Sequence, residues 1–277
     1  MKKANPNYPI KVLDKSLSIL ETMLRQGSAM NMTEISEKLG LYPSTIHRIL
    51  DTLKHWSYVE QDFHTQKYQL GLKALELGMA KLHQMDLVRE TTPYLKELVK
   101  QCNETVHLGV LEEGEVLYLA KEESSQTIRM ISYVGKRAPL HCTALGKVLL
   151  AYMSEKERKK ILEDRGLPRL TEKTITDKRK LEKELGEVKE QNFALDREEN
   201  EKDVCCIAAP IRNHQGEVIA AVSISSPIFR IDKNAQNNQK EALIETSEKI
   251  SKRLGYKEKS QKEEKRGAKA IEKFSKV

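Results

Sequence analysis

The feature that most constrains the fold of this chain is a pair of short amphipathic segments joined by a turn, between residues 33 and 55. Thr33 is predicted to cap the first segment, and Gly40 stands where a helix ends in a left-handed residue. Pro43 suits the first turn of the second segment, which extends to about His55. Two short helices separated by a turn of this length predict a helix-turn-helix.

The second helix has one apolar side and one polar side. At about 100° per residue, its apolar residues fall within one arc. They are Ile46, Ile49, Leu50 and Leu53. The opposite side carries Ser44, His47, Arg48, Asp51 and Thr52. An arginine near the start of such a helix can bond guanine O6 and N7 in the major groove of DNA. An ordinary solvated face on a packing helix would show the same pattern.

A predicted hairpin follows this helix. The β-prone segments 58–61 and 67–70 flank the polar stretch 62–66, which is typical of a wing. Its tip offers His64, Thr65 and Lys67 for contact with phosphates. A hairpin that only covers a small core would have much the same sequence, so the wing and the helix-turn-helix support each other.

Helices are expected on both sides of this motif. Apolar residues at helical spacing over 14–26 predict a first core helix that stops near Gly27. Its expected apolar positions are Val12, Leu13, Leu17, Leu20, Met23 and Leu24. After the wing, residues 72–84 predict a linker helix, in which Leu75, Leu77 and Met79 are available for packing or dimer contact.

The remainder predicts an α+β domain around an antiparallel sheet. A helical pattern over 87–99 precedes strand-like runs at 105–111, 116–121 and 127–133. Two further strands, 204–212 and 217–226, are joined by the turn 213–216. Ser223 and Ser225 alternate with Ile224, so both hydroxyls are expected on one face of the sheet. Such hydroxyls could line a ligand pocket or be two satisfied sheet residues.

The length and charge of the chain limit the classes of protein to which it can belong. A chain of 277 residues favours two domains, and no apolar run approaches the roughly 18 residues of a membrane helix. With no signal peptide evident, we expect a cytoplasmic protein without a membrane partner. Residues 253–277 hold nine Lys/Arg against four Asp/Glu, which leaves 39 against 37 in the rest. The net charge of +7 therefore reflects a basic, solvated tail more than a DNA-binding surface.

Enzyme and metal chemistry are not favoured by the motifs. Four cysteines in such a chain do not indicate a disulfide framework, and adjacent Cys205 and Cys206 lack C-x-x-C spacing. The G-x-S-x-G motif is absent, and a phosphate loop around Gly146 fails because its other required residues are missing. We expect no catalytic residue, metal or cofactor, with an enzyme using a Cys or Ser site of the C-terminal domain as the alternative.

The sequence resembles the IclR family of bacterial transcriptional regulators. The resemblance rests on segments in order along the chain, namely 33–41, 44–50, the wing, 71–78, 141–147, 206–211 and 220–227. It implies a winged helix-turn-helix over 10–72, a linker helix over 73–85, a GAF-like effector-binding domain over 86–256 and a basic tail over 257–277. It also implies a regulator, expected to be a repressor, that binds operator DNA as a dimer or tetramer.

The resemblance further implies which residues bind which partner. We expect double-stranded operator DNA to contact Thr33, Ser44, Thr45, His47, Arg48, His64 and Lys67. The family's effector site corresponds here to Thr127, Met130, Ala144, Leu145, Asp196, Val204, Cys206, Ser223 and Ser225. If a helix begins near Ala144, its free N–H groups favour a small organic acid as effector. Asp196 would instead accept hydrogen bonds from a hydroxyl or an amine.

The chain departs from the family pattern at two places. Ser57 stands where the family commonly has glycine, so we expect it to hold a left-handed backbone conformation. Lys202 and Asp203 replace a second glycine, which changes the expected shape of one wall of the effector site.

Overall fold

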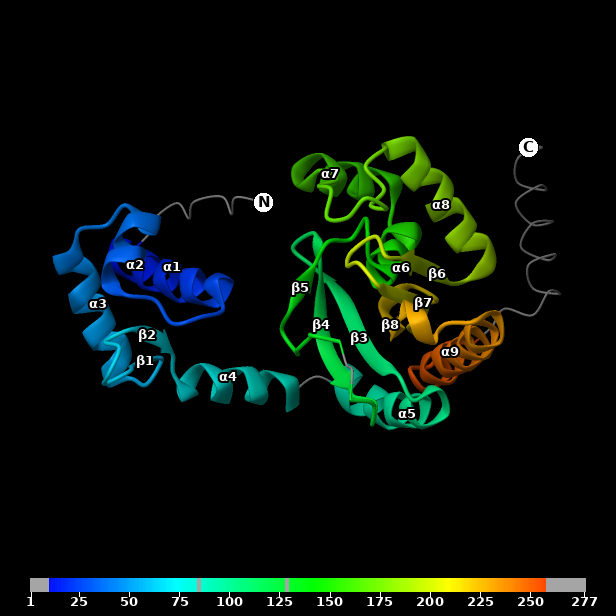
Figure 1. Ribbon diagram of the computed structural model, residues 1–277, viewed down its shortest axis with the longest axis horizontal. Helices are drawn as coiled ribbons and strands as arrows, with labels where there is room; N and C mark the ends of the chain where they lie inside the picture. Colours follow the sequence, from blue (N-terminus) through cyan, green and yellow to red (C-terminus); the bar gives the residue numbers. More distant parts are fainter. Residues whose placement is uncertain (1–9, 84–85, 128–129, 258–277) are drawn as a thin grey trace, which may run out of the picture. The chain divides into compact units, whose positions relative to one another are not determined.

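The computed structural model describes residues 10–83, 86–127 and 130–257. The chain divides into two compact units between Met85 and Asp86, and each is treated by itself. Figure 1 shows the N-terminal unit in blue to cyan and the C-terminal unit in green to orange. Of the expected basic tail, only Lys257 lies within the described residues. No helix in these described ranges is both long and apolar enough to cross a membrane.

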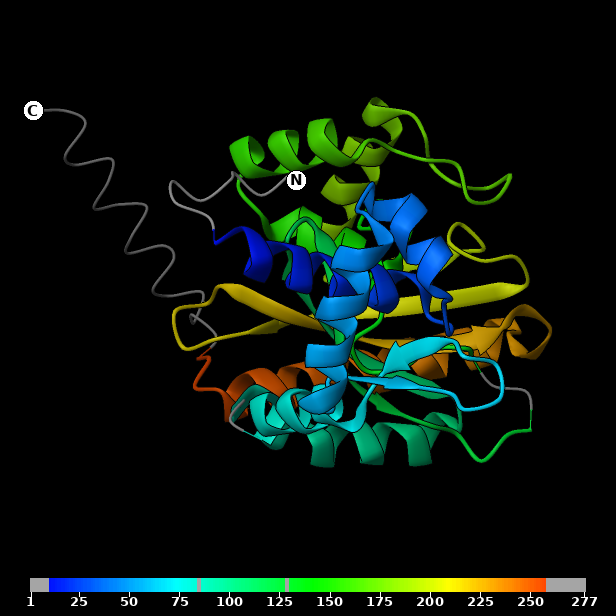
Figure 2. The same cartoon turned by 90° about the vertical axis from the view of Figure 1, so that its left-hand side faces the viewer.

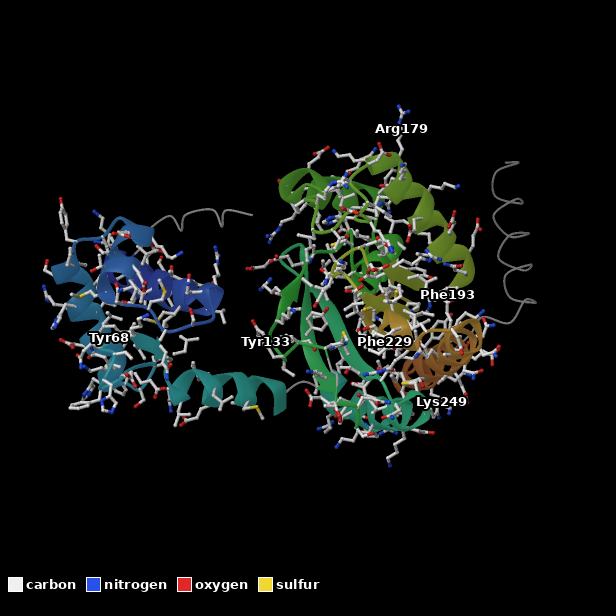
Figure 3. All side chains as sticks on the ribbon, in the orientation of Figure 1. Tyr68, Tyr133, Arg179, Phe193, Phe229 and Lys249 are labelled. Carbon is white, nitrogen blue, oxygen red and sulfur yellow. The ribbon has the colours of Figure 1, made fainter. Side chains whose placement is uncertain are left out.

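The N-terminal unit is the predicted winged helix-turn-helix, which is thereby confirmed. Its elements are α1 (Lys11–Gln26), α2 (Met32–Leu39), α3 (Pro43–His55), β1 (Val59–Gln61), β2 (Tyr68–Leu70) and α4 (Leu72–His83). The strands β1 and β2 pair antiparallel. Tyr68, labelled in Figure 3, is buried in a core shared with Ile35 of α2 and Ile46 of α3.

The start of α2 differs from the prediction. Asn31 caps this helix, because its side chain accepts a hydrogen bond from Glu34 N at 2.9 Å while Asn31 N donates to the Glu34 carboxylate at 2.8 Å. This reciprocal pair is a capping box. Thr33 is the second residue of the helix, so its predicted role as the cap is wrong. Both Asn and Thr cap helices well, and the Glu34 spacing is the signal that selects Asn31.

The buried face of α1 also differs from the prediction. The core takes Ile19 and Met23, whereas Leu13, Leu17 and Leu24 are each more than half exposed. At about 100° per residue the apolar residues of α1 occupy one broad arc, and the core takes the edge of that arc that holds Ile19 and Met23. Periodicity places the arc but not the part of it that is buried. An apolar stripe therefore remains on the surface of α1.

Ser57 has the left-handed conformation expected of it, with φ of 59°. Its carbonyl accepts a hydrogen bond from Lys73 N at 3.1 Å, which connects the end of α3 to the start of α4. Gly71 lies so close that a Cβ there would meet Ser57 O at 2.3 Å. The tight crossing thus depends on glycine at 71 and tolerates serine at 57.

The C-terminal unit is built on one six-stranded antiparallel sheet, in the order β5-β4-β3-β8-β7-β6. Its elements are α5 (Asp86–Cys102), β3 (Thr105–Glu112), β4 (Glu115–Glu122), β5 (Arg137–Ala138), α6 (Ala144–Tyr152), α7 (Glu155–Arg165), α8 (Lys178–Gln191), β6 (Ala194–Arg197), β7 (Val204–Arg212), β8 (Val218–Pro227) and α9 (Lys233–Arg253), with a 3₁₀ turn at Ile228–Arg230. This is the α+β architecture that the sequence predicts.

Helices cover both faces of this sheet. Figure 2 shows α5 and α9 together on one face and α6, α7 and α8 on the other. The alternation in β8 separates the two faces, since Ser223 and Ser225 lie on the α6 side while Val222 and Ile224 lie toward α5 and α9. The sheet is therefore the middle layer of three.

Two strand predictions need correction. The expected strand at 127–133 is a loop in its described part, residues 127 and 130–133, and the next strand is the short β5. β6 was not predicted, because Ala194–Arg197 has only four residues and follows a charged helix without a clear alternation. The β-branched and aromatic residues at 127–133 fit a strand, but the carbonyls of Met130, Ile131 and Ser132 accept hydrogen bonds from lysine side chains. One example is the Ser132 carbonyl, which accepts from Lys121 Nζ at 2.8 Å.

Gly146 sets how closely α6 approaches the chain before it. A Cβ at this position would meet the carbonyl oxygen of Leu140 at 2.2 Å and its Cα at 2.4 Å. Only glycine fits at such a distance. The contact brings the first turn of α6 down onto the sheet.

Candidate functional site

The exposed face of α3 matches the prediction in position. Ser44, His47 and Arg48 are exposed and Thr45 is half-buried, while Ile46, Ile49 and Leu50 anchor the helix in the core. His47 Nδ1 lies 3.1 Å from the Asp51 carboxylate, one turn later. Within the described part of the chain, no side chain bonds the guanidinium of Arg48. A guanidinium that is held on a packed helix and has no partner within the described protein is available to donate hydrogen bonds to another molecule.

The wing tip is a rigid turn. The Asp62 carboxylate accepts hydrogen bonds from His64 N at 3.2 Å, Thr65 N at 2.7 Å and the Thr65 hydroxyl at 2.7 Å. This turn exposes the side chain of His64, while Lys67 is half-buried at its end. Thr33 is exposed on the first turn of α2.

Two aromatic side chains of this unit were missed from the sequence. Tyr42, which precedes α3, is 82% exposed, and Phe63 at the wing tip is 83% exposed. Both stand beside residues expected to contact DNA. No periodic pattern marks them, because neither belongs to a regular element.

In the C-terminal unit, four of the predicted effector residues form one polar cluster on the α6 face of the sheet. Asp196 of β6 lies opposite Cys206 of β7, and Cys206 lies opposite Ser225 of β8. Ser223 is two residues along on the same face, which confirms the predicted alternation. Asp196, Ser223 and Ser225 are all buried.

His107 of β3 connects Ser225 of this cluster to Ser132 of the loop before β5, and it was not predicted. Its Nδ1 lies 3.4 Å from Ser225 Oγ, and its Nε2 lies 2.7 Å from the hydroxyl of Ser132. The Cys206 thiol donates to Ser225 Oγ at 3.1 Å. Burial, together with nearby Lys121 and Lys136, lowers the pKa of His107 to about 3, so the ring is neutral.

The first turn of α6 borders the cluster. Thr143 caps this helix, and its hydroxyl accepts from Gly146 N at 3.1 Å. Ala144 and Leu145 are the first two residues of the helix and are buried. Their N–H groups are among those that no carbonyl of the same helix can accept from, and they lie at the positive end of its dipole. This end of α6 is suited to an anion.

A second, charged group lies behind the cluster and was also missed. Lys147 of α6 is fully buried, and its ammonium bonds Glu199 at 2.7 Å and also Glu184 of α8. Burial raises the pKa of Asp196 to about 7, and Glu199 adds to this effect. A lysine and a glutamate in sequence resemble surface residues, and only the fold shows that they are enclosed together.

Three other predicted effector residues are less buried than the cluster. Thr127 is exposed, and Met130 and Val204 are half-buried. Residues 128 and 129, between the first two, are outside the described residues. Loop 130–136 reaches the cluster through Ser132 and His107, not through Thr127.

The cysteines do not form a reactive or metal-binding group in the described ranges. Burial raises the pKa of Cys142 to about 12 and that of Cys206 well above its usual value, so both are neutral thiols. No set of three or more His, Cys, Asp or Glu residues within these ranges could hold a metal ion.

Two grooves lie away from the cluster. One, of about 590 Å³, lies beside the wing, and the other, of about 610 Å³, lies between the C-terminal end of α6, α7 and the β7–β8 turn. Neither contains a predicted effector residue. In the second, Arg212 already stacks on the Tyr152 ring at 4.5 Å and bonds Asn192, so its charge is engaged. The buried polar cluster is therefore the better candidate for a ligand site.

Comparison with known proteins agrees with this division. Residues 12–62 match the IclR helix-turn-helix domain, and residues 79–252 match the C-terminal domain of the bacterial transcriptional regulator IclR. The chain is 39% identical over 242 residues to the HTH-type transcriptional regulator KdgR of Escherichia coli strain K12, covering 87% of this chain and 92% of KdgR.

Two further relatives are informative. The HTH-type transcriptional repressor AllR of Salmonella paratyphi A is 32% identical over 247 residues, covering 89% of this chain and 91% of AllR. A crystal structure of an IclR homologue from Microbacterium hydrocarbonoxydans, complexed with 4-hydroxybenzoate, superposes with a TM-score of 0.75 at 27% identity, covering 88% and 98% of the two chains.

These relatives and domains are transcriptional regulators and not enzymes. The helix-turn-helix accounts for operator binding, and the C-terminal domain for effector binding. The chain belongs to the IclR family of bacterial DNA-binding transcriptional regulators.

Proposed function

We propose that this regulator is a repressor whose affinity for its operator is changed by a small organic acid bound in the C-terminal unit. The observation that carries the proposal is the buried convergence of Asp196, Cys206, Ser223 and Ser225 beside the first turn of α6. Buried polar groups that converge next to free N–H groups are suited to a small polar ligand. The AllR relative is a repressor, which supports the same role here.

The operator contacts follow from the exposed side of α3. We assign base contacts to Arg48, with Ser44, Thr45 and His47 beside it, because this side of the helix is free while the other side is packed. Thr33, His64 and Lys67 are assigned to phosphates, which position the protein on the duplex without reading its sequence.

The effector is assigned to the carboxylates. The N-terminus of α6 favours an anion at Ala144 and Leu145, and Ser223 and Ser225 supply hydroxyls on the facing sheet. The relative from Microbacterium was crystallised with 4-hydroxybenzoate, which carries a carboxylate at one end and a hydroxyl at the other. Thr127, Met130 and Val204 are assigned to the margin of this site.

A dimer or tetramer is the proposed working unit. One recognition helix contacts too few base pairs for specificity, so two copies on two half-sites are needed. The N-terminal unit leaves apolar side chains exposed on two helices, Leu13 and Leu17 on α1 and Leu75 and Met79 on α4. A second copy that covers these faces would remove them from water. The proposed division is 10–72 for DNA, 73–85 for the linker and 86–256 for the effector.

Thermal-shift screening of the full chain against small organic acids tests the effector assignment. An acid that binds only the folded state raises the melting temperature. Footprinting with the same acid then measures operator occupancy. We expect protection of two half-sites about one helical turn, or a multiple of it, apart, and its loss when the acid is added. A single half-site occupied by a monomer, or a panel in which no acid shifts melting, contradicts the proposal.

A further inference from the structure

The charges behind the polar cluster do not balance. Lys147 is 0% exposed and is shared between Glu199, at 2.7 Å, and Glu184. Asp196, which is 2% exposed, interacts electrostatically with Glu199 and Lys147. The group therefore contains three carboxylates and one ammonium. Glu184 is partly open to solvent, but Asp196 and Glu199 are not.

The hydrogen bonds of the two buried carboxylates leave one carboxylate oxygen without a donor among the described residues. Asp196 Oδ1 accepts from Glu199 N at 2.8 Å and from Asn200 N at 3.4 Å. Glu199 Oε1 accepts from Lys147 and from Arg197 N, whereas Oε2 has no hydrogen-bond partner among the described residues. A buried carboxylate oxygen without a donor is costly, and a proton on one of the pair would remove that cost.

Among the described residues, Lys147 is the one cation shown to act on Asp196 and Glu199. The titratable groups that act on the pair come from β4, the loop before α6, α6 itself, α8 and β7. They are Tyr118, Cys142, Lys147, Glu184, Cys205 and Cys206. Lys147 is the one positive group in this set, and His107 of β3 is neutral. An effector carboxylate at the first turn of α6 would add a further negative charge to this environment.

We propose that Asp196 and Glu199 share one proton when the site is occupied, so that an acid effector and a proton bind together. The proposal rests on the carboxylate effector proposed above and adds the regulation of its binding. Two buried carboxylates that repel each other do not both ionise. With one proton, the pair faces the effector as a hydrogen-bond donor and no longer repels it.

The direction of the pH dependence follows. Burial raises the pKa of Asp196 to about 7 and also raises that of Glu199. Below pH 7 the pair already holds its proton, and effector affinity is insensitive to pH. Above it, the proton must be taken up on binding, so affinity falls by roughly tenfold for each pH unit.

Infrared difference spectroscopy of the full chain between pH 6 and pH 9 tests the proton without any ligand. We expect the carbonyl stretch of a protonated carboxyl at pH 6 that is lost at pH 9. Asp196→Asn and Glu199→Gln should each remove it, while Glu187→Gln, at an exposed position of α8, should leave it unchanged. Circular dichroism checks that the variants fold. Absence of the band in the wild type, or its survival in both pair variants, overturns the proposal.

Calorimetry in two buffers of different ionisation enthalpy tests the coupling. The probe is 4-hydroxybenzoate at pH 8, with 4-hydroxybenzamide as its uncharged control. We expect uptake of about one proton with the acid and none with the amide, and no uptake in Asp196→Asn. Binding of the acid without proton uptake overturns the proposal and leaves the effector class intact. Failure of this acid to bind counts against the proposed function. In that case the infrared result still shows whether Asp196 and Glu199 share a proton.

Discussion

The two units use their polar residues in opposite ways. On α3 the residues assigned to DNA are largely exposed and unengaged, whereas in the C-terminal unit Asp196, Ser223 and Ser225 are buried, and Asp196 and Ser225 already bond their neighbours. DNA is large and rigid, so a protein meets it with groups on its surface. A small acid has to be enclosed before a few hydrogen bonds can select it. A substitution should therefore change contact alone in the first unit, and packing as well in the second.

The largest effect is expected where the second unit is packed most tightly. Gly146→Ala places a Cβ 2.2 Å from Leu140 O, so α6 must move. We expect a loss of at least about 2 kcal/mol in the free energy of unfolding of this unit. Gly186→Ala is the matched control, because this glycine lies within α8 with nothing within 4 Å, and alanine there should stabilise the helix by about 0.5–1 kcal/mol. Denaturant titration measures both, and equal effects would show that the α6 contact is not tight.

In the N-terminal unit, two substitutions should change DNA binding in different ways. Arg48→Ala should cost about 1–3 kcal/mol on operator DNA and relax base preference, because it removes a bidentate donor. Lys67→Ala should weaken binding to all sequences and flatten its salt dependence, because it removes a phosphate contact. Titrations with operator and random DNA at several salt concentrations separate the two. Equal losses on both DNAs for Arg48→Ala would refute its assignment as a base-reading residue.

The smallest effect concerns the helix that precedes α3. Asn31→Ala removes the cap of α2 and should cost about 1 kcal/mol in the free energy of unfolding of the N-terminal unit. Thr33→Ala, two residues away and exposed, should change stability by less than about 0.5 kcal/mol. Thermal denaturation compares them. A larger loss from Thr33→Ala would mean that the capping box contributes little.

Periodicity predicted the parts of this molecule in which one face is buried and the other is not. The apolar arc of α3 and the alternation of Ser223, Ile224 and Ser225 both carried over to the structure. It failed where that contrast is missing. On α1 the apolar arc is wider than the side that the core buries, and β6 is too short for a pattern to show.

The part of the effector site that sequence could not predict is the part that depends on pairing. Lys147 and Glu199 look like surface residues until the fold encloses both, and each is then buried because the other is present. His107 was read as a strand residue, and its bonds reach Ser225 of β8 and Ser132 of a loop, which are both distant from it in sequence. Resemblance to the family supplied Asp196 and Cys206, which periodicity would have missed.

The central claim is that a buried cluster in one unit governs the DNA affinity of an exposed surface in the other. The direct test is operator affinity as a function of the concentration of the acid that gives the largest thermal shift, for the wild type and for Ser223→Ala/Ser225→Ala. Each lost hydrogen bond costs about 0.5–1.5 kcal/mol, so the double variant should bind operator normally without acid and need roughly 5- to 150-fold more acid for the same change. Circular dichroism confirms that both proteins are folded. An unchanged response to the acid would contradict the account, because it would mean that these serines do not contact the effector.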